Sequence, residues 1–163
     1  MKTRFDFVSN SSSCSFIVGD AAKLAETMKT LVGDDCSCSD FFRDITITAY
    51  AKKEHRAAFA AVEDIGEESI YTNFYDDGIQ FNLEFYQFIC LDGELVKKID
   101  QIRFECDDYN NAAVTNLSIL KKALCNLGID IDITSSERDF LFDGNDQVNF
   151  LHKIVSIAFG KNS

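Results

Sequence analysis

Apolar residues occupy every second position in three short segments of this chain, at residues 45–50, 102–106 and 129–133. Successive side chains of a β-strand point to opposite faces, so a period of two predicts strands with one buried and one solvated face. In the last segment, Asp130 and Asp132 fall on the face opposite the isoleucines. The pattern therefore predicts strands of an antiparallel sheet.

A β-hairpin is predicted in the middle of the chain. Residues 70–75 and 79–88 are rich in aromatic and β-branched residues, and Asp76-Asp77-Gly78 joins them. Asp-Gly between two such runs is a strong signal of a tight hairpin turn. In the second strand we expect the apolar side chains at odd positions, from 79 to 85, to face the core.

Apolar residues spaced by three or four positions predict helices at residues 21–32, 53–65, 111–127 and 145–159. Asp20 precedes the first helix as an N-cap, and a glycine follows each of the first three as a stop. The positions expected to face the core are Leu24, Met28 and Leu31 in the first helix, Val114, Leu117, Leu120, Leu124 and Leu127 in the third, and Val148, Leu151, Val155 and Phe159 in the last.

These elements predict an α+β fold, with one domain over residues 1–163 and a mainly antiparallel sheet that carries helices packed on one face. Residues 34–40 are predicted to be a polar loop, 92–93 a turn and 140–142 a further strand. The chain has 163 residues, of which 46% are hydrophobic and none is proline. This composition supports a substantial core and gives no sign of a linker.

The first eighteen residues form a distinct unit. Two short apolar runs, at residues 5–8 and 16–18, flank an almost entirely hydroxyl-bearing segment at 9–15. Serine and asparagine side chains bond to nearby backbone and favour turns. The segment therefore predicts a strand, a serine-rich structural turn and a second strand.

The sequence of this unit resembles an N-terminal motif of uncharacterised proteins from Gram-positive bacteria and their phages. The residues that carry the resemblance are Lys-Thr-Arg-Phe-Asp-Phe-Val-Ser-Asn-Ser-Ser-Ser-Cys-Ser-Phe-Ile-Val. The resemblance departs from that motif at Phe5 and Cys14, where the family pattern has Thr and Ser. It implies a phage or prophage origin and carries no activity with it.

Charge and cysteine content narrow the class of protein. The formal net charge is −11, and residues 1–30 hold four basic and three acidic side chains, so the negative charge lies in the remainder. Such a field opposes direct binding to nucleic acid. No apolar run is long enough for a signal peptide or a membrane span. We therefore expect a cytoplasmic protein of a bacterial host cell with reduced thiols. Three cysteines, Cys90, Cys106 and Cys125, are predicted to fill small core positions.

No catalytic or metal-binding motif is assembled in the sequence. Cys36 and Cys38 are one residue apart, without the second pair that structural zinc sites need, and the neighbouring aspartates oppose thiolate formation. His55 and His152 are predicted to lie on helix surfaces, and the carboxylates of the 129–133 strand on its solvated face. We expect neither a metal nor a cofactor.

Acidic doublets at predicted turns and element ends are the main candidates for partner binding. If several lie on one face, their carboxylates would attract a basic site that normally binds nucleic acid. The competing interpretation is solubility, because turns favour Asp and acidic surfaces keep small proteins apart. The predicted contact residues are Glu67, Glu68, Asp76, Asp77, Asp107 and Asp108.

The sequence thus favours an acidic, non-enzymatic interaction module. In its concrete form it is a phage-encoded inhibitor, of the anti-CRISPR or anti-defence type, that mimics nucleic acid and blocks a basic host nucleic-acid-binding protein. One alternative is a small cytoplasmic enzyme with a thiol or carboxylate site, for which the cysteines and histidines above are the first suspects. Another is a structural protein that self-associates through its Phe-rich sheet.

Overall fold

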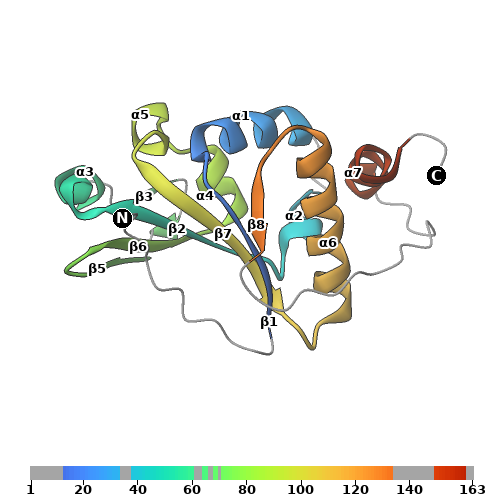
Figure 1. Cartoon of the computed structure of the whole chain (residues 1–163), viewed down its shortest axis with the longest axis horizontal. Coiled ribbons are helices and arrows are strands. Elements are labelled where there is room, and N and C mark those ends of the chain that lie inside the picture. The colour runs from blue at the N-terminus through green and yellow to red at the C-terminus, as the bar shows by residue number, and fades with distance from the viewer. Residues whose placement is uncertain are drawn as a thin grey trace.

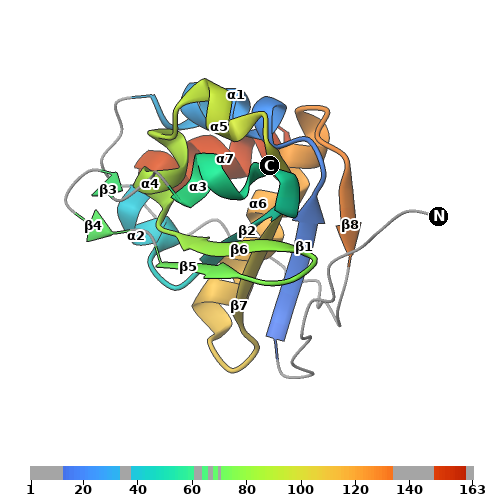
Figure 2. The same ribbon diagram turned by 90° about the vertical axis from the view of Figure 1, so that its left-hand side faces the viewer.

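The computed structural model describes residues 13–33, 38–60, 64–65, 68–69, 71–133 and 149–160. Within these residues the protein is an α+β domain with a six-stranded antiparallel sheet and helices on one face, as the sequence predicts (Figures 1 and 2). The strands are β1 (Ser13–Val18), β2 (Thr46–Lys52), β5 (Tyr71–Phe74), β6 (Gly78–Leu83), β7 (Ile99–Asp107) and β8 (Ile131–Ile133). Their order across the sheet is β5-β6-β2-β7-β1-β8. A separate two-stranded sheet pairs β3 (Asp64–Ile65) with β4 (Glu68–Ser69).

The helices lie together on one side of the sheet, which Figure 2 shows most clearly. They are α1 (Ala21–Val32), α2 (Cys38–Phe42), α3 (Arg56–Ala60), α4 (Phe85–Ile89), α5 (Gly93–Val96), α6 (Asn111–Asn126) and α7 (Asn149–Phe159), and the 3-10 turn η1 (Lys53–His55) precedes α3. No described helix is long and apolar enough to cross a membrane.

The core lies between the helices and the facing side of the sheet. Phe16 of β1 stacks on Phe104 of β7, with ring centroids 5.0 Å apart. Phe150 of α7 meets Phe41 of α2 edge to face at 5.3 Å. Each buried ring of this size removes a large apolar area from water and so stabilises the fold.

The opposite face of the sheet is polar and yet buried at its centre. The register places Thr48 opposite Arg103 and Tyr50 opposite Gln101. All four side chains are buried, and the Oε1 atom of Gln101 finds no hydrogen-bond partner within the described part of the chain. The buried polar groups of this face are therefore close enough to interact across the β2–β7 pair.

Two of the predicted helices are confirmed almost to the residue. Asp20 caps α1 by accepting the Lys23 backbone N–H at 3.0 Å, and Gly33 ends it with φ of +55°. The Asn110 side chain caps α6 in the same manner. The core stripe of α6 is also confirmed except at Leu127, which lies in the turn after the helix and is 40% exposed.

The hairpin is confirmed, but its second strand is shorter than predicted. Strand β6 ends at Leu83, and α4 begins at Phe85. The reason is a capping box, in which the Glu84 carboxylate accepts a backbone N–H of the first helical turn and the Gln87 side chain accepts the Glu84 N–H. Phe85 still faces the core, from a helix instead of a strand.

The predicted helix at 53–65 is wrong in its second half. Its described part is a 3-10 turn followed by α3, and Asp64–Ile65 instead forms a strand paired with β4. Backbone pairing in that small sheet overrides the weak helical periodicity. Similarly, the predicted turn at 92–93 opens the short helix α5, because the Asp92 carboxylate caps it.

Parts of two segments predicted as loops belong to a strand or a helix in the structure. Cys14 and Ser15 belong to β1 rather than to the serine-rich turn, since they pair with Cys106 and Glu105 of β7. In the predicted polar loop, Cys38 begins α2 and is fully buried. The predicted elements at residues 5–8, 9–12 and 140–142, and the helical positions 145–148, lie outside the described residues.

The core face of α7 is rotated relative to the prediction. Leu151 is buried as expected, but the other buried positions are Phe150, Ile154 and Ala158, while Phe159 is exposed. The Phe150 ring fixes this orientation through its contacts with the rings of α2.

The cysteine predictions succeed only in part. Cys106 is buried as predicted, whereas Cys90 and Cys125 are exposed, because Cys90 follows the end of α4 and Cys125 lies on the outer side of α6. Cys14 and Cys38 are the other two buried thiols among the described residues.

Candidate functional site

The acidic doublets lie at opposite ends of the sheet. Lys52 pairs with Gly78, next to Asp76 and Asp77, whereas Thr46 pairs with Glu105, two residues before Asp107. Strand β2 separates these two points by about 20 Å, at roughly 3.3 Å per residue. The structure therefore does not bring the two doublets together. Of the other predicted contact residues, Glu68 begins β4 and Glu67 lies outside the described residues.

Basic side chains lie near the doublet Asp76-Asp77 at the hairpin. Asp76 and Asp77 are exposed in the β5–β6 turn, which the Tyr75 N–H closes by donating to the Gly78 carbonyl at 2.8 Å. The neighbouring chain contributes Lys52 and Lys53, and Arg56 lies 5.0 Å from the centroid of the exposed Phe74 ring. Opposite charges at this hairpin end offset one another, so little net field extends from it.

The other end of the sheet gathers carboxylates from several segments. Thr46 at the start of β2 pairs with Glu105 of β7. On the other side of β2, Ile47 pairs with Leu83, and Glu84 follows directly as the N-cap of α4. We call this region the acidic end and define it as Asp40, Asp44, Glu84, Glu105, Asp107 and Asp108.

The two arginines of the acidic end are both engaged. Arg43 forms an exposed ion pair with Asp40. Arg103 is 3% exposed and donates to the Ser15 hydroxyl and to the Glu105 carboxylate, each at 3.3 Å. Since one guanidinium is buried and the other is paired, the described surface here is strongly negative.

Burial around Arg103 also affects its neighbours. Burial raises the pKa of Tyr50 to about 12, although the nearby Arg103 guanidinium opposes that rise. The phenol is therefore neutral at physiological pH, and Tyr50 contributes no charge to the polar face.

The second doublet is tied into the fold by its side chains. Asp107 accepts the Tyr109 backbone N–H at 2.9 Å, and Asp108 accepts the Cys14 thiol at 3.3 Å. Tyr109 itself is 82% exposed. Burial, followed by the proximity of Cys14 and of the carboxylates, raises the pKa of the Cys106 thiol to about 12. The hydrogen bonds of Asp107 and Asp108 hold these two carboxylates in fixed positions beside the exposed ring of Tyr109.

An open groove of about 480 Å³ lies at the acidic end, where the chain segments leading into β2 and out of β6 diverge. Phe42 and Phe85 stack beneath it, with ring centroids 4.0 Å apart and planes 7° from parallel. Arg43, Glu84 and Tyr86 line its sides. Its volume falls within the range of small-ligand pockets.

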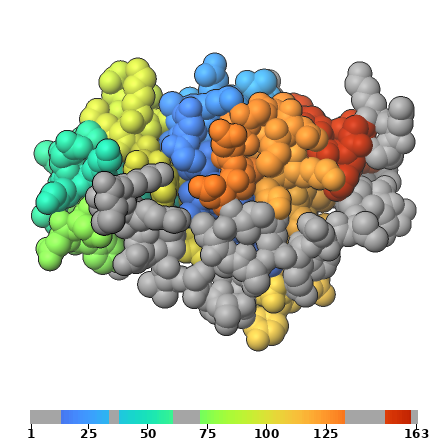
Figure 3. Space-filling model, viewed as in Figure 1, coloured from blue at the N-terminus to red at the C-terminus, as the bar shows by residue number. Residues whose placement is uncertain are grey.

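Lysines gather elsewhere, around a second hollow of about 430 Å³ between α1, α7 and the end of α6. Lys23 and Lys153 line it together with Leu127, and the Lys23 ammonium donates to the Gly128 carbonyl at 2.6 Å. Figure 3 shows these three helices adjoining at the surface. Positive and negative side chains are thus partly segregated between the helical layer and one end of the sheet.

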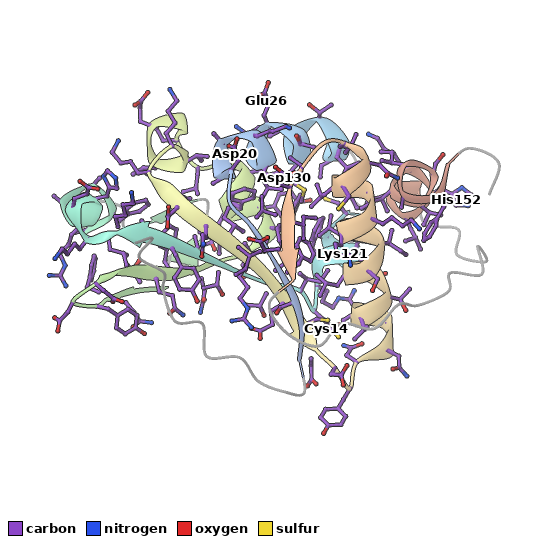
Figure 4. The ribbon with its side chains drawn as sticks, in the orientation of Figure 1. Cys14, Asp20, Glu26, Lys121, Asp130 and His152 are labelled. Carbon is purple, nitrogen blue, oxygen red and sulfur yellow. The ribbon has the colours of Figure 1, made fainter. Side chains whose placement is uncertain are left out.

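The candidate thiol and histidine residues are not brought together. Cys38 is fully buried and its thiol lies 3.4 Å from the Tyr86 hydroxyl, while Cys36 lies outside the described residues. His55 is half-buried in η1, and His152 points away from the body of the molecule (Figure 4). Cys14 lies on β1 beside α6 in the same view.

The carboxylates considered as metal ligands are not brought together with other ligands among the described residues either. Asp130 and Asp132 are exposed near β8, as their alternation with isoleucines predicts. Among the described residues no three His, Cys, Asp or Glu side chains are placed to hold a metal ion.

Sequence reasoning missed four members of the acidic end, namely Asp40, Asp44, Glu84 and Glu105. None of them belongs to a doublet, and only the register of β2 with its neighbours assembles them. No family model, curated protein or solved structure matches the chain.

Proposed function

We propose that this protein is a non-enzymatic interaction module whose acidic end binds a basic site on a host protein and excludes nucleic acid from it. A phage-encoded inhibitor of the anti-CRISPR or anti-defence type, acting in the bacterial cytoplasm, is the concrete form of the proposal. The single observation that carries it is the gathering of six carboxylates at one end of the sheet, beside one paired and one buried arginine.

The physical basis is the rigidity of these charges. Glu84 is fixed by a helix cap and Glu105 by Arg103, while Asp107 and Asp108 accept hydrogen bonds from the fold. Carboxylates held in place lose little freedom on binding and present a steady negative field. Such a field speeds association with a basic surface and weakens as salt is added.

Exposed aromatic side chains supply the apolar part of the interface. Tyr86 and Tyr109 both lie at the acidic end and are 44% and 82% exposed. Tyrosine is enriched at the centres of protein interfaces, because it combines a large apolar surface with a polar tip. The other predicted contacts, Glu67, Glu68, Asp76 and Asp77, are not among the six residues that define the acidic end and stay predictions.

The alternatives draw less support from the described residues. The phenylalanines of the central strands, Phe16, Phe81 and Phe104, are buried in the core, so they do not offer a Phe-rich face for self-association. Of the two cysteines first considered for a thiol enzyme, Cys38 is fully buried, which disfavours it as a nucleophile, and Cys36 lies outside the described residues.

The test has two stages. The protein is used to capture partners from a bacterial lysate at low and high salt, and the purified partner is then titrated with labelled nucleic acid. We expect this protein to displace the nucleic acid and to lose affinity steeply with salt. A partner that keeps its nucleic acid in the complex, or whose affinity ignores salt, would refute the proposal.

A further inference from the structure

We propose that the groove at the acidic end receives an arginine side chain of the protein partner. The inference rests on the proposed function for the partner's identity, but its chemistry is testable on this protein alone. Binding of an arginine would make the groove the specificity pocket of the interface. The surrounding carboxylates would attract the basic partner over a longer range.

The shape of the groove suits a long, flat side chain. The parallel Phe42 and Phe85 rings form an apolar floor, and Tyr86, at 44% exposure, stands at one side. An arginine side chain has an apolar stem and a planar guanidinium. The stem can lie on the floor while the guanidinium stacks on the tyrosine ring.

The charge of the groove suits a cation. Glu84 lines it, and the Arg43 guanidinium, which also lines it, forms an ion pair with Asp40. Outside the lining, Asp44 lies two residues before Thr46 and adds further negative charge. Since Arg43 is paired with Asp40, Glu84 is the lining charge without an ion-pair partner among the described residues, and charge complementarity favours a basic occupant.

Arginine fits better than lysine because of geometry. A guanidinium presents a planar fork of donors to a carboxylate and stacks on aromatic rings, whereas an ammonium is a compact, strongly hydrated point charge. The groove offers one carboxylate and one accessible aromatic face on the same helix, at Glu84 and Tyr86.

The groove is also held in shape before any partner arrives. The Glu84 N–H donates to the Gln87 side chain at 2.7 Å, which fixes the start of α4. The Tyr86 hydroxyl meets the buried Cys38 thiol at 3.4 Å, which joins α4 to α2. A preformed pocket avoids much of the entropy cost of ordering side chains on binding.

The experiment uses N-acetyl-arginine amide as the probe and N-acetyl-citrulline amide as its neutral match. Both are titrated into the full chain and followed by NMR chemical shifts. We expect weak, saturable binding of the arginine probe, with shifts centred on α4 and the turn before β2. The citrulline probe should bind at least fivefold more weakly.

Glu84→Gln provides the matched variant, because glutamine keeps an oxygen that can accept the capping N–H while removing the charge. We expect it to weaken the arginine probe at least threefold. Glu94→Gln on α5, an exposed glutamate paired with Lys97, should leave binding unchanged. Tyr86→Leu, which keeps an apolar side chain, should weaken the arginine probe and leave the weaker citrulline probe almost unchanged.

Equal binding of the two probes, or shifts located outside the groove, would overturn the arginine assignment. That result would leave the proposed function standing if the protein still displaced nucleic acid from its partner. If the probe binds the groove but no partner loses nucleic acid, the pocket stands and the proposed function fails. Binding of the free probe without any effect of Glu84→Gln on partner affinity would indicate a small-molecule site and would refute the docking role.

Discussion

The two ends of the sheet carry the same sequence feature and use it differently. Each has two adjacent aspartates where a strand ends, Asp76-Asp77 in the turn at the hairpin end and Asp107-Asp108 at the end of β7 at the acidic end. The hairpin pair projects into solvent among lysines and Arg56, whereas the second pair bonds to the fold and joins other carboxylates. Whether a pair of aspartates contributes to a negative electrostatic field therefore depends on the charged residues that strand pairing places near it, and not on the pair alone.

The largest expected difference between the two ends concerns stability. Arg103→Met removes the buried guanidinium and leaves Glu105 among carboxylates without its counter-charge. Removal of one partner of a fully buried pair costs roughly 3–5 kcal/mol, and because Glu105 is 28% exposed we expect about 2–3 kcal/mol. Urea denaturation followed by circular dichroism measures this change.

The control for this variant is Arg56→Met at the hairpin end. Arg56 is exposed and lies over the ring of Phe74, an interaction worth roughly 0.5–1 kcal/mol at such sites. If the two variants proved equally stable, charges at the acidic end would be no more integral to the fold than those at the hairpin, and the comparison would fail.

The next difference concerns the attraction of cations. Asp44→Lys combined with Asp107→Lys, and separately Asp76→Lys combined with Asp77→Lys, change the net charge by the same amount. We expect the first pair to weaken binding of a fluorescent oligo-arginine peptide by about fivefold at low salt, roughly 1 kcal/mol, and the second by less than twofold. Fluorescence anisotropy measures both affinities.

Added salt should reduce the gap between these two variants, since screening shortens the reach of the field. Circular dichroism at matched concentration establishes that each variant is folded. Equal losses for the two pairs would mean that the peptide senses only total charge, and the acidic end would then have no special role.

The smallest difference concerns alkaline pH. Cys106 is neutral when protonated, and its pKa is raised to about 12 by burial and by the thiol and carboxylates beside it. This stabilises the fold fully below the pKa of an unperturbed thiol, near 9, and the contribution is lost as pH rises toward 12. We therefore expect the free energy of unfolding to fall over that interval.

Cys106→Ala should make that fall less steep, because the group that titrates is gone. Cys125→Ala is the control, since that thiol is exposed on α6. Urea titrations at pH 8 and pH 10.5 measure the difference. A slope that is the same in all three proteins would show that Cys106 does not contribute to it.

The sequence predicts the elements whose local signals agree with the fold. Asp20, Gly33 and the apolar stripe of α6 place two helices correctly, and Asp-Gly places the hairpin. The alternation of apolar and polar residues does not by itself show where a strand ends. Phe85 is buried like the apolar residues of β6 before it, but it belongs to helix α4.

The acidic end could not be predicted in the same way. Its members come from α2, the segment between α2 and β2, the N-cap of α4 and the end of β7, and the pairing of β2 with both neighbouring strands brings these segments to one end of the sheet. A sequence reveals which aspartates are adjacent along the chain. It does not reveal which strands pair, and so it does not reveal that Glu84 and Glu105 lie at the same end of the sheet.

The position of β1 has a consequence for synthesis on the ribosome. It is the earliest described strand, yet it lies between β7 and β8, and Phe16 pairs with Phe104 and Ile133. Domains emerge N-terminus first, and pairing across such sequence distances is slow compared with closure of a local hairpin such as β5–β6. The nascent chain therefore holds this apolar strand without its native partner strands until β7 has been translated, well past the middle of the chain.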